Sequence, residues 1–275
     1  MTEDLLAAIS DRSDQPTPSA TVMLVRDGDA GLEVLLLRRH KGADFAEAWV
    51  FPGGLAAPMD FDRSLDPFCS GLDDSGASAQ LGVESGGLGL WVAAVRECFE
   101  ESGLLLARNF EGALCQPGAA DNVSRFRDYR VALANNEMTL REVCELECLT
   151  LDLARLEYVS FWTTPVDLPR RYATRFFVAP VPDHQEGAPD GRETTESRWI
   201  GPAEAIAAAS DDGDLKMHPP TRVNLQWLAQ YDSVSAVMAA ARKLDKRQIE
   251  EIVPVIDPAT DARSVKLPDG TRVPL

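Results

Sequence analysis

The alternation of apolar and polar residues along the chain predicts a mixture of strands and helices. Short runs rich in Val, Leu and aromatic residues, which are typical of strands, occur at 21–26, 33–38, 49–51, 158–163, 175–181 and 198–200. Between residues 90 and 102 the apolar positions recur every three or four residues, which indicates an amphipathic helix that Gly103 is placed to end. Further helices are expected at 123–134, 139–148, 202–209 and 221–231. The fold class is therefore α/β.

Changes in composition divide this pattern into parts. Residues 1–19 are polar and contain proline, so we expect an N-terminal appendage before a main domain at 20–231. Residues 55–89 show little periodicity and predict a long inserted surface loop, whereas 108–156 predict a helical insertion. Residues 232–275 are expected to form a C-terminal helix and hairpin extension.

The charge balance limits the partners of the chain. It has 27 Lys and Arg against 44 Asp and Glu, so its formal net charge is −17, which repels nucleic acid and anionic lipid surfaces. No secretory signal is apparent, and no apolar run is long enough to span a bilayer. The five cysteines form no CxxC pair and do not suggest a disulfide framework. We therefore expect a cytoplasmic protein without nucleic-acid or membrane partners.

Candidate chemistry is concentrated in the helix that ends at Gly103. Glu97, Glu100 and Glu101 have the spacing i, i+3 and i+4, so they form one stripe on the side away from the apolar face. Like charges at this spacing weaken a helix by a few tenths of a kcal/mol per pair unless a cation compensates them. A solvated acidic helix face is one interpretation, and a site for Mg²⁺ or Mn²⁺, which take oxygen ligands, is the other.

The residues from Arg96 to Leu104, with the sequence RECFEESGL, resemble the second half of the Nudix signature, Gx5Ex7REUxEExGU, in which U is aliphatic. The first half differs, because Leu88 stands where the signature has its first Glu. The Pro-Gly-Gly sequence that usually enters this region occurs at 52–54, over forty residues before Arg96.

This resemblance implies a Nudix-type α/β/α sandwich with a mixed sheet, here carrying a long loop insertion and a helical insertion. It also implies that Glu97, Glu100 and Glu101 bind the metal ion and that Arg96 orients them. Gly53 and Gly54 are expected to contribute to substrate binding.

Three later segments, 162–165, 170–177 and 193–199, are similar to the Nudix branch that contains peroxisomal coenzyme A diphosphatases. The resemblance implies hydrolysis of a diphosphate bond in coenzyme A or acyl-coenzyme A. ADP-ribose or another nucleoside diphosphate derivative is the alternative substrate. A noncatalytic Nudix-fold ligand sensor is the alternative class, although all three metal-binding acids are retained. A homodimer is common among relatives, and the sequence leaves the oligomeric state open.

Further site residues are expected outside the helix. Nudix enzymes commonly recruit an acid from a loop before a late strand, and Glu193 is favoured over Glu196 as general base or extra metal ligand. Arg171 and Arg175 have the guanidinium groups that suit phosphate oxygens, although surface salt bridges would use them equally well.

Overall fold

A computed structural model describes residues 15–42, 47–166, 168, 170–209, 214–256, 263–266 and 272–274. Its largest sheet is mixed and has the strand order β10-β2-β1-β9-β8-β11. Strand β3 also pairs with β2, and strand β4 also pairs with β1. These strands are β1 (Thr17–Gly28), β2 (Gly31–Arg39), β3 (Trp49–Val50), β4 (Gly53–Leu55), β8 (Glu157–Thr163), β9 (Tyr172–Pro180), β10 (Thr194–Ile200) and β11 (Glu251–Ile252). The pairs β1–β9 and β8–β11 are parallel and the remaining pairs are antiparallel.

The strands expected at 21–26 and 33–38 are confirmed, and they form a hairpin. Strands β1 and β2 pair from Val25 opposite Val34 to Gly28 opposite Gly31, so two residues form the turn. Alternate β1 side chains enter different cores: Val22 and Leu24 lie on one face of the sheet and Met23 and Val25 on the other. Both faces of the sheet are therefore buried.

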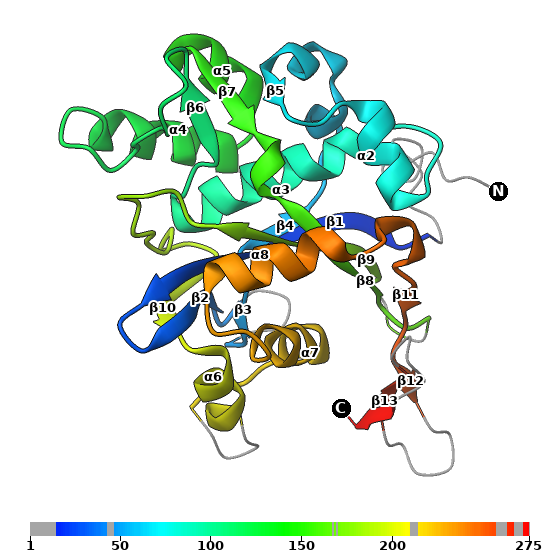
Figure 1. The fold of residues 1–275 in the computed structure, drawn as a ribbon. Helices are drawn as coiled ribbons and strands as arrows, with labels where there is room; N and C mark the ends of the chain where they lie inside the picture. The colour runs from blue at the N-terminus through cyan, green and yellow to red at the C-terminus, as the bar shows by residue number, and fades with distance from the viewer. Residues whose placement is uncertain are drawn as a thin grey trace.

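Helices cover these two faces and complete an α/β/α sandwich (Figure 1). Helix α3 (Gly87–Ser102) packs on one face, where the Trp91 and Phe177 rings lie 4.7 Å apart. Helices α6 (Pro202–Ala208), α7 (Pro219–Leu228) and α8 (Val234–Lys243) contribute to the core on the other face. The expected α/β/α sandwich with a mixed sheet is confirmed.

The expectation that residues 55–89 form a loop with little regular structure was wrong. They contain the 3₁₀ helices η1 (Pro58–Phe61) and η2 (Arg63–Phe68), strand β5 (Cys69–Ser70), helix α2 (Asp74–Leu81) and the first residues of α3. The small residues that suggested a loop allow close packing instead. A Cβ atom added at Gly87 would lie 2.4 Å from the backbone N of Ser78 in α2.

The two insertions form one layer on the outer side of α3 (Figure 1). The helices expected in the second insertion are confirmed as α4 (Val123–Ala134) and α5 (Leu140–Glu147). Strands β6 (Ala107–Asn109) and β7 (Leu149–Asp152) accompany them, followed by η3 (Leu153–Arg155). A three-stranded sheet in the order β5-β7-β6 joins the first insertion to the second.

The segment beyond residue 231 contributes to the main fold. Helix α8 packs against β1, β8 and β9, and after η4 (Lys246–Gln248) strand β11 pairs with β8. The expected terminal hairpin is present as β13 (Arg263–Lys266) and β14 (Arg272–Pro274), which form a small sheet with β12 (Val255–Ile256). At the other end β1 begins at Thr17, within the expected appendage, and residues 1–14 lie outside the described residues. The domain boundaries stay a prediction.

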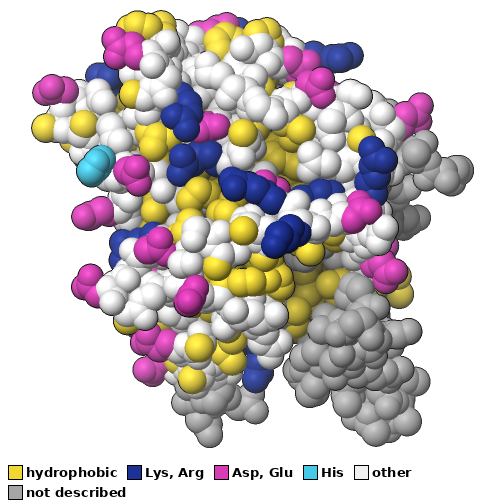
Figure 2. Space-filling model, viewed as in Figure 1, with side chains coloured by type: hydrophobic (Ala, Val, Ile, Leu, Met, Phe, Trp, Pro, Cys, Tyr) yellow, Lys and Arg dark blue, Asp and Glu magenta, His cyan; other side chains and the backbone are white. Residues whose placement is uncertain are grey.

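The surface charge is unevenly distributed. Figure 2 shows Lys and Arg side chains in a band across the middle of one face, although the whole chain carries −17. The net charge therefore does not describe every face of the molecule. Among the described residues, no helix has the length and apolar character needed to cross a membrane.

Candidate active site

Helix α3 places the acidic residues beside β4. The helix ends at Gly103, whose φ of 74° is the left-handed conformation that glycine adopts easily. Its apolar side is anchored in the core by Trp91, Val95 and Cys98, all almost fully buried. The opposite side, with the carboxylates, consequently faces the Gly53–Leu55 strand.

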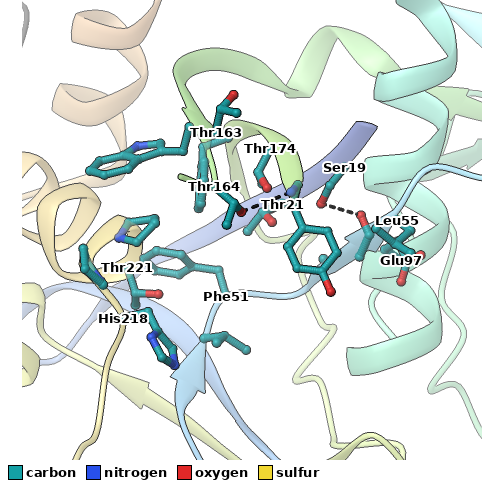
Figure 3. Close-up of a pocket in the computed structure, with 18 of the residues that line it drawn as sticks. Ser19, Thr21, Phe51, Leu55, Glu97, Thr163, Thr164, Thr174, His218 and Thr221 are labelled. Atoms are coloured by element: carbon teal, nitrogen blue, oxygen red, sulfur yellow. Dashed lines mark hydrogen bonds between the residues drawn. The ribbon is translucent and has the colours of Figure 1, made fainter. Parts of the chain in front are cut away.

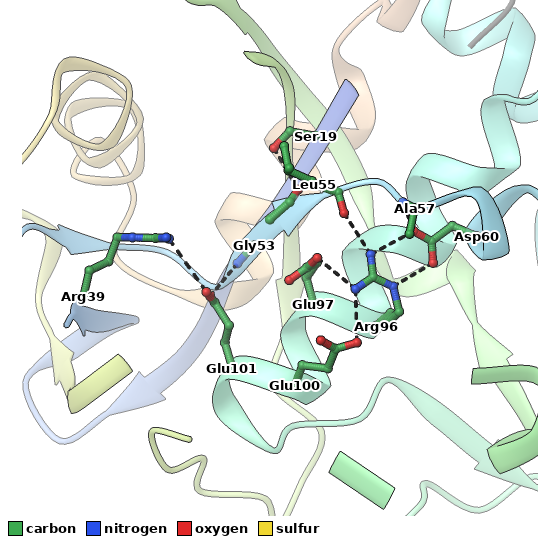
Figure 4. Close-up of polar contacts among 11 residues, drawn as sticks. Ser19, Arg39, Gly53, Leu55, Ala57, Asp60, Arg96, Glu97, Glu100 and Glu101 are labelled. Atoms are coloured by element: carbon green, nitrogen blue, oxygen red, sulfur yellow. Dashed lines mark hydrogen bonds and ion pairs between the residues drawn. The ribbon is translucent and has the colours of Figure 1, made fainter. Parts of the chain in front are cut away.

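Arg96 is the centre of the polar network (Figure 4). Its Nε and Nη2 donate to the two carboxylate oxygens of Asp60 at 2.8 and 2.9 Å, and Nη2 also donates to the Leu55 carbonyl at 2.9 Å. Its Nη1 donates to Glu97 at 2.9 Å and to Glu100 at 3.1 Å. Burial alone would lower the pKa of Arg96, but Asp60, Glu97 and Glu100 together raise it well above its ordinary value. Arg96 therefore stays charged and connects η1 to the acids of α3.

Asp60 supplies the first carboxylate of the Nudix signature, which was expected at position 88, where this chain has Leu. It follows Gly54 by six residues, which is the Gx5E spacing of the Nudix signature with Asp in place of Glu. The signature is thus present but divided, and much of the first insertion lies between Asp60 and Arg96. Sequence reasoning missed Asp60 because the signature was counted back from Arg96 rather than forward from Gly54.

The three acids of α3 are held in different ways. Arg96 contacts Glu97 and Glu100, whereas a Glu101 oxygen accepts the Gly53 N–H at 2.9 Å and the other lies 3.8 Å from Arg39 Nη1. Burial raises the pKa of Glu97 to about 7 and that of Glu101 to about 8, with a further contribution to Glu101 from the charge of Glu97. Burial also raises the pKa of Glu100, and Arg96 opposes this effect. Without a cation, burial therefore disfavours the charged forms of these acids.

This donor set suits a divalent cation. The side chains offer only carboxylate oxygens, which Mg²⁺ and Mn²⁺ prefer, and an ion with two positive charges would offset the charge of these acids. In the described part of the chain no three acidic, His or Cys side chains already converge on one point. Glu97, Glu100 and Glu101 share one end of α3, but Glu97 and Glu100 contact Arg96 whereas Glu101 contacts Gly53 and Arg39.

A cavity of about 490 Å³ begins at these acids (Figure 3). Glu97, Glu100, Glu193 and Arg39 supply charged groups to its lining. The cavity extends between the α7-side face of the sheet, with Thr21, Thr174 and Phe176, and the start of α7 at His218–Thr221. Its volume lies in the range of about 300–1,000 Å³ that is usual for small-molecule sites.

The structure brings together only some of the other predicted residues. Glu193 lines the cavity, and its charge contributes to raising the pKa values of Glu100 and Glu101. Glu196 instead pairs with Arg38 at 2.6 Å. Gly53 and Gly54 line the cavity, and a Cβ atom at Gly54 would lie 2.5 Å from Glu97 Oε2.

The two arginines expected to contact phosphate do not line the cavity. Arg171 Nε donates to the Thr164 carbonyl at 3.1 Å. Arg175 is buried, with its guanidinium 3.8 Å from the centre of the Phe161 ring. Because β9 side chains alternate, Arg175 lies on the opposite face from Thr174 and Phe176, which line the cavity.

Arg39 and His218 line the cavity but were not predicted as site residues. Arg39, at the end of β2, lies beside Glu101 and has a buried Nε without a hydrogen-bond partner among the described residues. His218 precedes α7, and burial together with Lys216 and Arg39 lowers its pKa. Their signals in the sequence were weak, since one is a strand-end arginine and the other a histidine before two prolines.

The sandwich, the divided signature and the acid-lined cavity define a Nudix hydrolase, a class that acts on pyrophosphate bonds and generally uses divalent metal ions. The model of the NUDT19 Nudix domain family matches residues 79–228, more than half of the chain. The chain belongs to this family.

Individual relatives agree with this assignment. The chain is 26% identical over 279 residues to "Acyl-coenzyme A diphosphatase NUDT19" of Xenopus laevis, covering 88% of this chain and 71% of the frog protein. It is 29% identical to the Homo sapiens protein of the same name over 65% of this chain and 48% of the human one, so it spans about half of the human relative. A solved NUDIX hydrolase from Alicyclobacillus acidocaldarius is 26% identical, with a TM-score of 0.67 over 82% of this chain and 96% of that chain.

Proposed function

We propose that this chain hydrolyses the diphosphate bond of coenzyme A and acyl-coenzyme A. The observation that carries the proposal is the cavity of about 490 Å³ that opens directly from the α3 carboxylates, which gives room for a large group attached to a diphosphate. The frog and human relatives named acyl-coenzyme A diphosphatase support the choice of substrate.

Each charged residue of the cavity has a role in this proposal. Glu97, Glu100 and Glu101 hold Mg²⁺ or Mn²⁺, which when bound supplies positive charge to the diphosphate and acidity to the attacking water. Arg96 keeps Glu97 and Glu100 in place, and the Gly53 N–H orients Glu101. Arg39, the one Lys or Arg among the described residues that line the cavity, pairs with diphosphate oxygens through its guanidinium group. Glu193, exposed at the cavity, accepts the proton of the attacking water.

The test is a hydrolysis assay with coenzyme A, acyl-coenzyme A, ADP-ribose, NADH and diadenosine polyphosphates, each with Mg²⁺ or Mn²⁺. We expect coenzyme A or its acyl derivative to yield 4′-phosphopantetheine or its acyl form and adenosine 3′,5′-bisphosphate. Glu100→Gln should lower kcat on the order of 100-fold or more, because it removes charge where the transition state needs it. Hydrolysis in ¹⁸O-labelled water identifies which phosphorus is attacked.

Glu111→Gln is the matched control, since this exposed glutamate lies in the turn after β6. It should retain wild-type kcat. Calorimetric titration with Mn²⁺ gives a second readout, in which Glu100→Gln should bind the ion more weakly than Glu111→Gln. Cleavage of ADP-ribose alone would replace the proposed substrate, and binding of coenzyme A without cleavage of any compound would contradict the enzymatic role.

Two further expectations stay predictions. A cytoplasmic location rests only on the sequence, and size-exclusion chromatography with light scattering would test the homodimer.

A further inference from the structure

Away from the acids, the cavity lining is rich in hydroxyl groups and almost free of charge. The uncharged lining residues with hydroxyl groups are Ser19, Thr21, Thr163, Thr164, Tyr172, Thr174 and Thr221. Aromatic and proline residues supply much of the remainder, including Phe51, Trp162 and Pro219. Such a lining suits a long, neutral group with several amides, because a hydroxyl can both donate and accept hydrogen bonds.

The lining is poorly suited to a phosphate away from the acids. Among the described residues that line the cavity, Arg39 is the only Lys or Arg, and it lies 3.8 Å from Glu101. A phosphate monoester placed near Thr221 or Trp162 would be buried with no cation from the lining beside it, which is unfavourable. Figure 3 shows Glu97 and Leu55 on one side of the cavity and Thr221 and His218 across from them.

One donor in this neutral part lacks a partner. Trp162 lines the cavity and is 3% exposed, yet its indole N–H makes no hydrogen bond with any described residue. A buried donor without an acceptor is unfavourable, and such groups are rare in folded proteins. The indole nitrogen is itself closed to the cavity, so other atoms of the Trp162 ring supply apolar surface to the lining.

We propose that the cavity binds the amide-containing pantetheine arm of coenzyme A, and that the 3′-phosphorylated adenosine half stays outside it. This inference rests on the proposed function for the identity of the substrate. The two halves of coenzyme A differ in charge. The pantetheine arm is neutral and carries two amides and a hydroxyl, whereas the adenosine half carries a charged phosphate monoester. The diphosphate between them lies at Glu97, Glu100 and Arg39.

The experiment is calorimetric titration of the full chain with 4′-phosphopantetheine and, separately, with adenosine 3′,5′-bisphosphate. The variants are Thr174→Val and Thr221→Val, each of which removes a cavity hydroxyl but keeps the side-chain shape. Each should weaken 4′-phosphopantetheine binding about 3- to 10-fold, the range expected for one hydrogen bond. Binding of adenosine 3′,5′-bisphosphate should change less than about twofold.

The matched controls are Thr150→Val on β7 and Thr195→Val on β10, neither of which lines the cavity. Both should bind the two compounds as the wild type does. Thermal unfolding of every variant identifies any loss of folding, and the two cavity variants act as independent tests. If the cavity variants weaken only the binding of adenosine 3′,5′-bisphosphate, the adenosine half occupies the cavity and the proposal is overturned. If they change the binding of neither compound, neither half contacts these side chains and the proposal is overturned as well.

Failure of the proposed catalytic function can be distinguished from failure of the cavity assignment. If the wild type does not hydrolyse coenzyme A but binds 4′-phosphopantetheine through Thr174 and Thr221, the cavity assignment stands and the catalytic proposal fails. If coenzyme A is hydrolysed and the cavity variants bind 4′-phosphopantetheine normally, the cavity assignment fails alone.

Discussion

At the scale of single residues, the contact that most affects the site is the pair between Arg96 and Asp60. Both side chains are buried, and two hydrogen bonds join them across 36 residues of sequence. A glutamate at position 88 would stand eight residues before Arg96 on the same helix, about 12 Å away along its axis. The divided signature is therefore effective only because η1 carries Asp60 to the side chain of Arg96.

Asp60→Asn should lower the free energy of unfolding by about 1.5–3 kcal/mol, because it removes a buried charge-assisted hydrogen bond while Glu97 and Glu100 still neutralise Arg96. Urea unfolding measures the loss. Asp66→Asn is the control, since its partner Arg63 is largely exposed, and should change stability by less than about 1 kcal/mol. Adding Leu88→Glu to Asp60→Asn should not restore the lost free energy of unfolding. Recovery of stability in that double variant would show that the expected signature position still serves Arg96.

At the scale of elements, the close approach of β4 to α3 shapes the acid end of the cavity. Strand β4 pairs with β1, and Ser19 fixes it further by donating its hydroxyl hydrogen to the Gly54 carbonyl at 2.8 Å. The Gly53 N–H and the Leu55 carbonyl then bind Glu101 and Arg96. One short strand thus aligns residues of the helix through its backbone, which explains why its first two positions are glycine.

Gly54→Ala should lower kcat/KM by about tenfold or more while the protein stays folded. The new Cβ would lie 2.5 Å from Glu97 Oε2, so the carboxylate must move, and misplacement by about 1 Å is costly for catalysis. Steady-state kinetics and urea unfolding measure the two effects. Gly118→Ala, which adds a Cβ with no atom within 4 Å, should leave kcat/KM unchanged. Equal kinetics in the two variants would show that the β4–α3 contact does not position Glu97.

At the scale of the whole molecule, the insertions and the sandwich share one hydrophobic core. The same cluster contains Val22 of β1, Phe177 of β9, Val95 of α3, Leu151 of β7 and Val143 of α5. Since β5 of the first insertion pairs with β7 of the second, the small sheet spans both insertions, and β5 has its strand partner only in the second one. We therefore expect the insertion layer and the main sheet to unfold together.

Leu151→Ala should lower the free energy of unfolding by about 2–5 kcal/mol, because it opens a cavity at a fully buried position. Circular dichroism in the near and far ultraviolet should report one shared transition in urea. Leu146→Ala, at a side chain that is 61% exposed, should cost far less. Two separate transitions, with Leu151→Ala moving only one, would show that the insertions are an independent unit.

The sequence by itself determined the features that depend on neighbours along the chain. The period of apolar residues gives α3, and the spacing of Glu97, Glu100 and Glu101 gives their common side of the helix. The β1–β2 hairpin and the helices α4 and α5 follow from local pattern and turn chemistry. The resemblance to the Nudix signature predicted the class of enzyme.

Only the tertiary structure decided which distant residues meet. Asp60 reaches Arg96 because the first insertion folds back on α3, and its small residues favour close packing rather than a loop. Alternation along β9 divides Arg175 from Thr174, but which face borders the cavity depends on the packing of α7. In the same way Glu193 lines the cavity and Glu196 pairs with Arg38, after a register shift at the start of β10. The physical reason is that spacing along the chain fixes the face of a helix or strand, whereas the neighbours of that face are set by how the elements pack.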